Sequence, residues 1–123
     1  MQQHENDTII ALATPPGEGG IAILRMSGKD SIPILEGIFS PKRKIDVRKM
    51  ESHKMVYGWI EDGNERLDEA LVVIMRAPNT YTREDTVEIH CHGGLIPVRR
   101  ILELCMKRGC RLAEPGEFTK RAF

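Results

Sequence analysis

A hairpin signal occupies residues 55–75, which read MVYGWIEDGNERLDEALVVIM. Two apolar runs within it, Met55 to Ile60 and Leu67 to Met75, are typical of strands. The segment Glu61–Glu65 between them contains Asp-Gly, a strong short-range signal for a tight turn. Because such a turn joins antiparallel neighbours, the sheet that holds this hairpin cannot be wholly parallel.

Strands and helices alternate on both sides of the hairpin. Upstream we expect strands at residues 7–13 and 21–26, then a helix that is capped by Asp30 or Ser31 and carries Ile32, Ile34, Leu35 and Ile38. Downstream we expect one helical turn at Thr82–Asp85, a strand at residues 86–90, a helix over residues 95–108 ended by Gly109, and a short strand at Cys110–Ala113. This order predicts an α+β domain, a mixed sheet with flanking helices.

Two helices are predicted in the second half of the chain. The helix over residues 95–108 has an apolar stripe made of Val98, Ile101, Leu102 and Cys105. A second helix is expected to begin at Glu117, since Pro115-Gly116 precede a charged amphipathic run and a carboxylate favours the positive end of a helix. Because the sequence stops at Phe123, soon after that helix begins, we expect this chain to be part of a longer protein.

Length and composition are those of one ordinary domain. The chain has 123 residues, enough to bury a core without disulfides or a metal. Its 18 basic and 18 acidic residues balance, which gives no support for non-specific attraction to nucleic acid or anionic lipid. Residues 1–8 are unlike a signal peptide, and the longest apolar stretch, Ala70 to Met75, is too short to cross a membrane. We expect a cytoplasmic protein with three reduced cysteines and no membrane partner.

Two segments resemble phosphate or nucleic-acid sites only superficially. Gly17-Glu18-Gly19-Gly20 leads into a strand, and the lysine of the Walker pattern does not follow it. A plain turn, or a slim loop that lets the backbone approach a ligand, fits this segment better. Residues 41–44, Pro-Lys-Arg-Lys, are few for a basic patch and are interpreted as a solvated loop.

His90, Cys91 and His92 suggest a metal site, with Cys105 and Cys110 as further ligands. Alternation along a strand places the two histidines on one face and Cys91 on the other. Cys105 is already assigned to the apolar face of a helix, and the sequence has neither Cys-x-x-Cys nor His-Glu-x-x-His spacing. The sequence therefore predicts no metal site.

Glu88 and Arg25 are charged residues inside otherwise apolar strands. Glu88 shares a face with Thr86 and His90. It is either an ordinary solvent-facing residue or a carboxylate on a rigid element, able to accept two parallel N–H donors from a flat heterocycle. Arg25 follows the apolar run 21–24, and a charge that needs a partner when buried is a candidate to meet an anionic ligand group.

Four motifs, in order and in register, resemble one family. They are Asp7-Thr8-Ile9-Ile10-Ala11 with Ala13-Thr14-Pro15-Pro16-Gly17, Arg25-Met26-Ser27-Gly28, Glu88 with His92-Gly93-Gly94, and Glu114-Pro115-Gly116-Glu117-Phe118-Thr119-Lys120-Arg121-Ala122-Phe123. Together they resemble the N-terminal domain of the tRNA-modifying GTPases called MnmE or TrmE. The resemblance covers nearly the whole chain apart from residues 41–51 and the hairpin turn.

The resemblance implies a fold, a ligand and an assembly. The fold would be similar to the tetrahydrofolate-binding domain of the glycine-cleavage T-protein, the ligand a formyl-tetrahydrofolate, and the assembly a homodimer. Residues 1–118 would form this folate-binding and dimerisation domain, and residues 119–123 would start a helix leading to a helical domain and a G domain absent from this chain. The full protein would hydrolyse GTP with the help of potassium and magnesium. With the flavoprotein MnmG, or GidA, it would modify carbon five of the tRNA wobble uridine, in carboxymethylaminomethyl or aminomethyl uridine synthesis.

The folate contacts of the family are placed here residue by residue. The folate-contacting arginine of the family matches Arg25 and its glutamate matches Glu88, while a third contact, a lysine shortly after Arg121-Ala122-Phe123, lies past the end of this sequence. We assign no catalytic residue to this chain, because the GTPase residues would belong to the G domain. Two alternatives stay open: a dimerisation module whose folate pocket has lost its ligand, and a free-standing folate-dependent one-carbon transferase.

Overall fold

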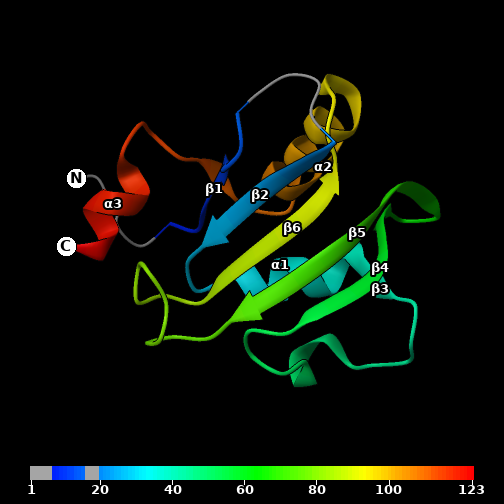
Figure 1. Cartoon of the computed structure of the whole chain (residues 1–123), viewed down its shortest axis with the longest axis horizontal. Helices are drawn as coiled ribbons and strands as arrows, with labels where there is room; N and C mark the ends of the chain where they lie inside the picture. Colours follow the sequence, from blue (N-terminus) through cyan, green and yellow to red (C-terminus); the bar gives the residue numbers. More distant parts are fainter. Residues whose placement is uncertain (1–6, 16–19) are drawn as a thin grey trace.

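A mixed sheet with helices packed against it forms the fold (Figure 1). The computed structural model describes residues 7–15 and 20–123. The elements in chain order are β1 (Ile9–Leu12), β2 (Ile21–Ser27), α1 (Ser31–Ile38), β3 (Phe39–Pro41), the 3₁₀ helix η2 (Val47–Lys49), β4 (Met55–Asp62), β5 (Glu65–Met75), β6 (Thr86–His92), α2 (Leu95–Lys107), β7 (Arg111–Leu112) and α3 (Glu117–Ala122).

The sheet order confirms the predicted α+β class. Within the described residues the strands lie side by side as β3-β4-β5-β6-β2-β1-β7. Neighbouring strands are antiparallel, with the exception of β1 and β7, which are parallel. The helices predicted over residues 95–108 and from Glu117 both form, and so does the short strand expected near residues 110–113.

The hairpin at residues 55–75 forms as predicted, with a tighter turn. β4 continues to Asp62 and β5 begins at Glu65, and these two residues are paired, which leaves Gly63 and Asn64 as the loop. Gly63 has a φ of 61°. It occupies the first central position, where a type II′ turn takes glycine.

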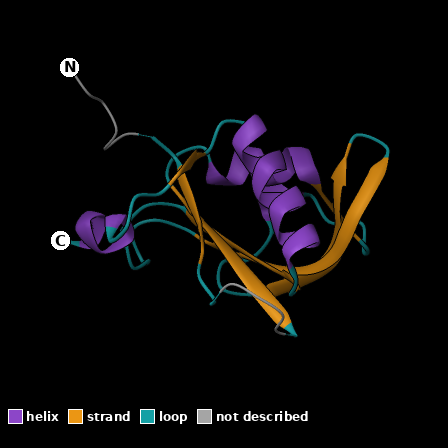
Figure 2. Ribbon diagram, turned by 90° about the horizontal axis from the view of Figure 1, so that it is seen from above, coloured by secondary structure: helices purple, strands orange, loops and turns teal. Residues whose placement is uncertain are grey.

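The hydrophobic core lies between the helices and one face of the sheet (Figure 2). The helical side chains that are buried there are Ile34, Leu35 and Ile38 of α1 and Ile101, Leu104 and Cys105 of α2. In β6, Val87 and Ile89 are fully buried while Glu88 and His90 are half-buried, so successive side chains alternate between the faces as the sequence predicts.

The opposite face of the sheet has no covering helix in the part of the chain that the structure describes (Figure 2). Ile21 of β2, Met55 of β4 and Leu71 of β5 are exposed, with 64%, 48% and 42% of their surface accessible. We call this the open face. The register of β2, β5 and β6 also places Arg25, Glu88 and His90 on it, and it therefore holds the candidate site.

The helical turn predicted at Thr82–Asp85 is wrong. This segment is a series of bends, in which Arg83 has a φ of 67°, outside the helical region. The Thr82 hydroxyl accepts a hydrogen bond from the Glu84 backbone N–H, and the Thr80 hydroxyl donates to the Glu84 carbonyl. Such local side-chain bonds to the backbone compete with those of a helix, which explains the difference.

The two longer helices differ from prediction only in detail. Asp30 stands at the N-cap position of α1, but its carboxylate caps no backbone N–H among the described residues, and its own N–H donates to Thr8 Oγ1 at 2.9 Å. In α2, Ile101 and Cys105 are buried as predicted. Leu104 is buried too, although the predicted stripe omitted it, because α2 packs against the sheet over a wider arc.

Candidate functional site

Arg25 and Glu88 lie opposite each other on neighbouring strands. β2 and β6 pair with these two residues in register, so both side chains leave the same face of the sheet. Arg25 Nε donates to Glu88 Oε2 at 2.8 Å, and Arg25 Nη2 lies 2.7 Å from the same oxygen. The two side chains are 39% and 17% exposed. Two candidate residues separated by 63 positions in the sequence therefore form one ion pair.

His90 holds the other oxygen of the Glu88 carboxylate. It lies on the same face of β6, with Nε2 3.0 Å from Glu88 Oε1, so a proton on Nε2 makes the ring the donor. Burial raises the pKa of Glu88, but the hydrogen bonds from His90 and Arg25 outweigh burial and hold this pKa below its usual range. Glu88 is thus ionised at neutral pH and accepts hydrogen bonds at both oxygens.

A pocket of about 320 Å³ opens beside the ion pair. Arg25, Glu88 and Met75 line it from the strands, residues 80–82 line it from the loop between β5 and β6, and Phe118 lines it from α3. This volume lies at the small end of the range for small-molecule sites. A carboxylate, a guanidinium and an aromatic ring around one such cavity suit a flat, polar heterocycle.

A second hollow, of about 440 Å³, lies along the open face next to His90. Ile21, Met55 and Leu71 give it an apolar lining, and Tyr57 and Glu69 add polar atoms. Exposed apolar residues gathered over several strands mark a surface suited to contact with another molecule. The charged pocket and this apolar hollow thus share one face of the sheet.

Comparison with known proteins settles the family. A family model described as the N-terminus of the GTP-binding protein TrmE matches residues 8–123. The chain belongs to this family. It is 57% identical over 119 residues to the tRNA modification GTPase MnmE of Thermoanaerobacter pseudethanolicus, with 95% of this chain and 26% of that protein covered. The MnmE proteins of Moorella thermoacetica and Listeria welshimeri are 54% and 53% identical over 120 and 119 residues, covering 96% and 97% of this chain and 26% of each relative.

The chain spans about a quarter of the length of these MnmE relatives. What it shares with them is the TrmE N-terminal domain, the region that carries Arg25 and Glu88. The word GTPase in the names of the relatives describes proteins roughly four times as long.

In this TrmE-family domain the histidines on the open face bond to carboxylates. His92 Nδ1 lies 2.7 Å from Asp68 Oδ1, and this bond raises the pKa of His92. Cys91 points to the buried side of the sheet, where burial raises the pKa of its thiol to about 11. Among the described residues no three His, Cys, Asp or Glu side chains come together in a way that could hold a metal ion.

Residues 80–82 and Phe118 line the pocket, and the sequence did not predict this. Thr82 was predicted only as part of a helical turn, and Phe118 was named only as part of a family motif. His90 does not line the pocket; it was considered as a metal ligand and placed on the same face as Glu88, but its bond to Glu88 was not predicted. The one signal that could have found Phe118 is an aromatic residue in the first turn of a short, charged helix. Nothing in the sequence indicates that this helix lies beside β2 and β6.

Two further sequence predictions concern the glycine-rich segment and the absence of a membrane span. Residues 16–19 of the glycine loop lie outside the described residues, so the argument against a Walker loop rests on the sequence. In the described part of the chain, no helix has the length and apolar content needed to span a membrane.

Proposed function

We propose that this chain binds a formyl-tetrahydrofolate in the pocket beside Arg25 and Glu88. The Arg25–Glu88 ion pair is the observation that carries the proposal. In the structure Glu88 accepts hydrogen bonds from a guanidinium, and the pterin ring of a folate presents adjacent N–H and amino donors in a similar arrangement. When the pterin edge takes this place on Glu88, Arg25 is free to turn toward an anionic part of the ligand, because its side chain is 39% exposed.

We further propose that the domain forms a homodimer through the open face. Its exposed apolar residues, Ile21, Met55 and Leu71, lie beside the ligand pocket rather than across the molecule from it. Pairing of two copies over this surface would remove the apolar side chains from water. The same observation favours the second candidate function, a dimerisation module that no longer binds folate.

At the level of the whole protein we propose the role that its relatives' names suggest. The domain would serve a cytoplasmic GTPase that acts in tRNA modification, with hydrolysis of GTP, and its potassium and magnesium ions, in a separate G domain. With the flavoprotein MnmG, that protein would modify carbon five of the wobble uridine, and the bound folate would supply the one-carbon unit. This chain would contribute the folate site and the dimer contact, and no catalytic residue for GTP hydrolysis.

Titration calorimetry with a panel of reduced folates tests the proposed ligand. We expect saturable binding of 5-formyltetrahydrofolate with one site per chain, and weaker binding of folic acid, which lacks the one-carbon group. Heats no larger than dilution for every folate, from protein that unfolds cooperatively on heating, would leave the dimerisation module as the better function. One-carbon transfer to an acceptor by this chain alone would instead support the free-standing transferase.

A further inference from the structure

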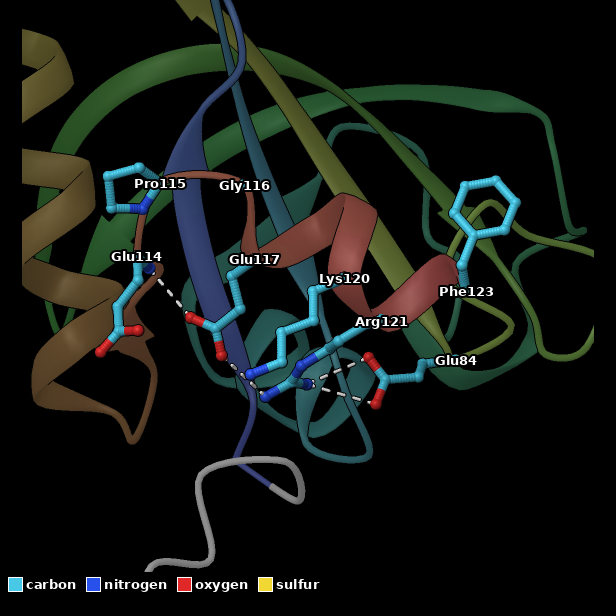
Figure 3. A pocket seen from close by; sticks show the side chains of 8 residues that line it. All are labelled: Glu84, Glu114, Pro115, Gly116, Glu117, Lys120, Arg121 and Phe123. Carbon is cyan, nitrogen blue, oxygen red and sulfur yellow. Dashed lines mark hydrogen bonds and ion pairs between the residues drawn. The ribbon is translucent and has the colours of Figure 1, made fainter.

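Arg121 of α3 is held between two carboxylates (Figure 3). Its Nη1 lies 3.1 and 3.2 Å from the two oxygens of Glu84, and its Nη2 lies 3.5 Å from Glu117 Oε2. Only 8% of the Arg121 side chain is exposed. Glu117 belongs to the same helix as Arg121, whereas Glu84 belongs to a loop, so the buried guanidinium is suited to holding that helix against the loop.

The first partner, Glu84, belongs to the loop that lines the ligand pocket. Its carboxylate also accepts a hydrogen bond from Ser27 Oγ at 2.7 Å, at the end of β2. Ser27 Oγ lies 2.6 Å from Thr82 Oγ1, and both residues are buried. Through Glu84, Arg121 is therefore connected to the loop residue Thr82, which lines the pocket beside Arg25 and Glu88.

The second partner, Glu117, anchors the start of α3. Both of its oxygens accept hydrogen bonds from Arg111 of β7, at 3.1 and 2.6 Å, and Oε1 also accepts the backbone N–H of Glu114. These bonds lower the pKa of Glu117 to about 2, and the hydrogen bond from Arg111 has the largest effect. Without Arg121, Glu117 would keep Arg111, whereas Glu84 would lose its cationic partner. Loss of Arg121 should therefore separate the loop from α3, although Arg111 would still bind the first residue of the helix.

The same helix and loop form one wall of the ligand pocket. Phe118 of α3 lies one turn before Arg121, and it lines the pocket together with Tyr81 and Thr82 of the loop. Tyr81 Oη lies 3.2 Å from Thr119 Oγ1, a second link between loop and helix. α3 also borders a hollow of about 500 Å³, lined by Glu84, Glu117 and Arg121 themselves (Figure 3).

We propose that Arg121 is a positioning residue for the pocket. By joining Glu84 to Glu117, it holds Phe118 and residues 80–82 at the separation that shapes the pocket before the ligand arrives. The nature of the ligand rests on the proposed function, whereas the link between helix and loop does not. Because coupling between two equilibria is reciprocal, a ligand against Phe118 also stabilises the docked position of α3.

Two measurements on Arg121→Gln test this role, with Arg48→Gln as a control for the loss of an arginine–glutamate pair away from the pocket. Arg48 also pairs with a glutamate, Glu36, at 2.7 Å, but from η2 to α1, and neither residue lines the pocket. The first measurement is calorimetric affinity for 5-formyltetrahydrofolate, and the second is amide hydrogen exchange without and with that ligand. Arg121→Lys keeps the charge but not the two-pronged geometry, and Glu84→Gln removes the charge at the loop if Arg121→Gln fails to fold.

We expect Arg121→Gln to bind 5-formyltetrahydrofolate about tenfold more weakly, because residues 80–82 and Phe118 would have to become ordered when the ligand binds. Arg48→Gln should bind like the parent. Arg121→Lys should lie between them. Without ligand, exchange should quicken in residues 80–85 and in α3 together, and in the parent the ligand should slow both. Unchanged affinity in Arg121→Gln, or quicker exchange confined to α3, would overturn the proposal. If the parent binds no folate, the proposed function fails. The exchange measurement without ligand still tests the link, because Arg121→Gln should quicken exchange in the loop and in α3 together if Arg121 joins them.

Discussion

Replacing Glu88 by alanine should abolish most folate binding and leave the fold intact. In the proposed complex the Glu88 carboxylate accepts two hydrogen bonds from the pterin edge, and bonds to a charged acceptor are about twice as strong as neutral ones. Loss of the acceptor also leaves ligand donors unpaired in the pocket. The cost should be about 2–4 kcal/mol, which is thirtyfold or more in affinity.

The cost to stability should be much smaller. Arg25 is 39% exposed and turns to water when Glu88 is removed, and His90 is 22% exposed and can do the same. Partly exposed ion pairs contribute up to about 1 kcal/mol, which for a domain of this size lowers the unfolding temperature by about 5 °C or less. This separation between a large binding effect and a small stability effect is what distinguishes a ligand residue from a structural one.

Calorimetry with 5-formyltetrahydrofolate and thermal unfolding without ligand measure the two effects. Glu61→Ala is the matched control, because Glu61 forms a similar pair with Arg66 at 3.0 Å in the hairpin, away from the pocket. The control should bind like the parent. If Glu88→Ala binds as tightly as the parent, Glu88 is an ordinary surface residue. If it unfolds far below the parent, its role is structural.

Further predictions concern assembly, nucleotide, pH and the core. Sedimentation equilibrium at tens of micromolar should show a dimer, and Leu71→Glu, which places a charge on the open face, should shift it to monomer; a parent that stays monomeric contradicts the proposed contact. A labelled GTP analogue should show no saturable binding to residues 1–123, because the loop Gly17–Gly20 lacks the lysine and helix of a phosphate site. Glu117 has a pKa of about 2 when folded against an ordinary value of 4.5, so its contribution to stability is present above pH 4.5 and is lost as the pH falls toward 2. Glu117→Gln should therefore flatten the acid limb of the stability curve, and an unchanged limb would mean that Arg111 holds Glu117 too weakly to matter. Ile101→Ala in the core should cost about 2–5 kcal/mol in urea unfolding, and a loss under 1 kcal/mol would mean that α2 packs loosely on the sheet.

The sequence is informative about local structure because local structure leaves periodic patterns. The Asp62-Gly63 pair correctly predicted the turn of the β4–β5 hairpin, and the predicted alternation of side chains between the two faces of the sheet around Glu88 is present in β6. The pairing of β2 with β6 and the parallel contact of β1 with β7 join segments far apart in the chain, and no pattern within either segment encodes them. The sheet order was therefore beyond prediction from periodicity alone.

In the candidate site, too, single residues could be predicted from local patterns, whereas contacts between distant segments could not. Arg25 and Glu88 each attracted notice because a charge inside an apolar strand needs a partner, but nothing local indicated that each is the partner of the other. The bond from His90 to Glu88 depends on side-chain orientation along one strand, and the approach of Phe118 depends on where α3 docks. Residues of a site were thus identifiable singly, whereas their arrangement required the tertiary structure.

A crystal structure of this chain with 5-formyltetrahydrofolate would test the central claim most directly. We expect the pterin ring in the pocket between β2, β6 and Phe118, with two of its N–H donors at about 2.7–2.9 Å from the Glu88 oxygens, the range of charge-assisted bonds. Arg25 should have moved from Glu88 Oε2 toward an anionic group of the ligand. A folate bound elsewhere, with the Arg25–Glu88 and His90–Glu88 contacts unchanged, would show that Glu88 is not the pterin-binding residue.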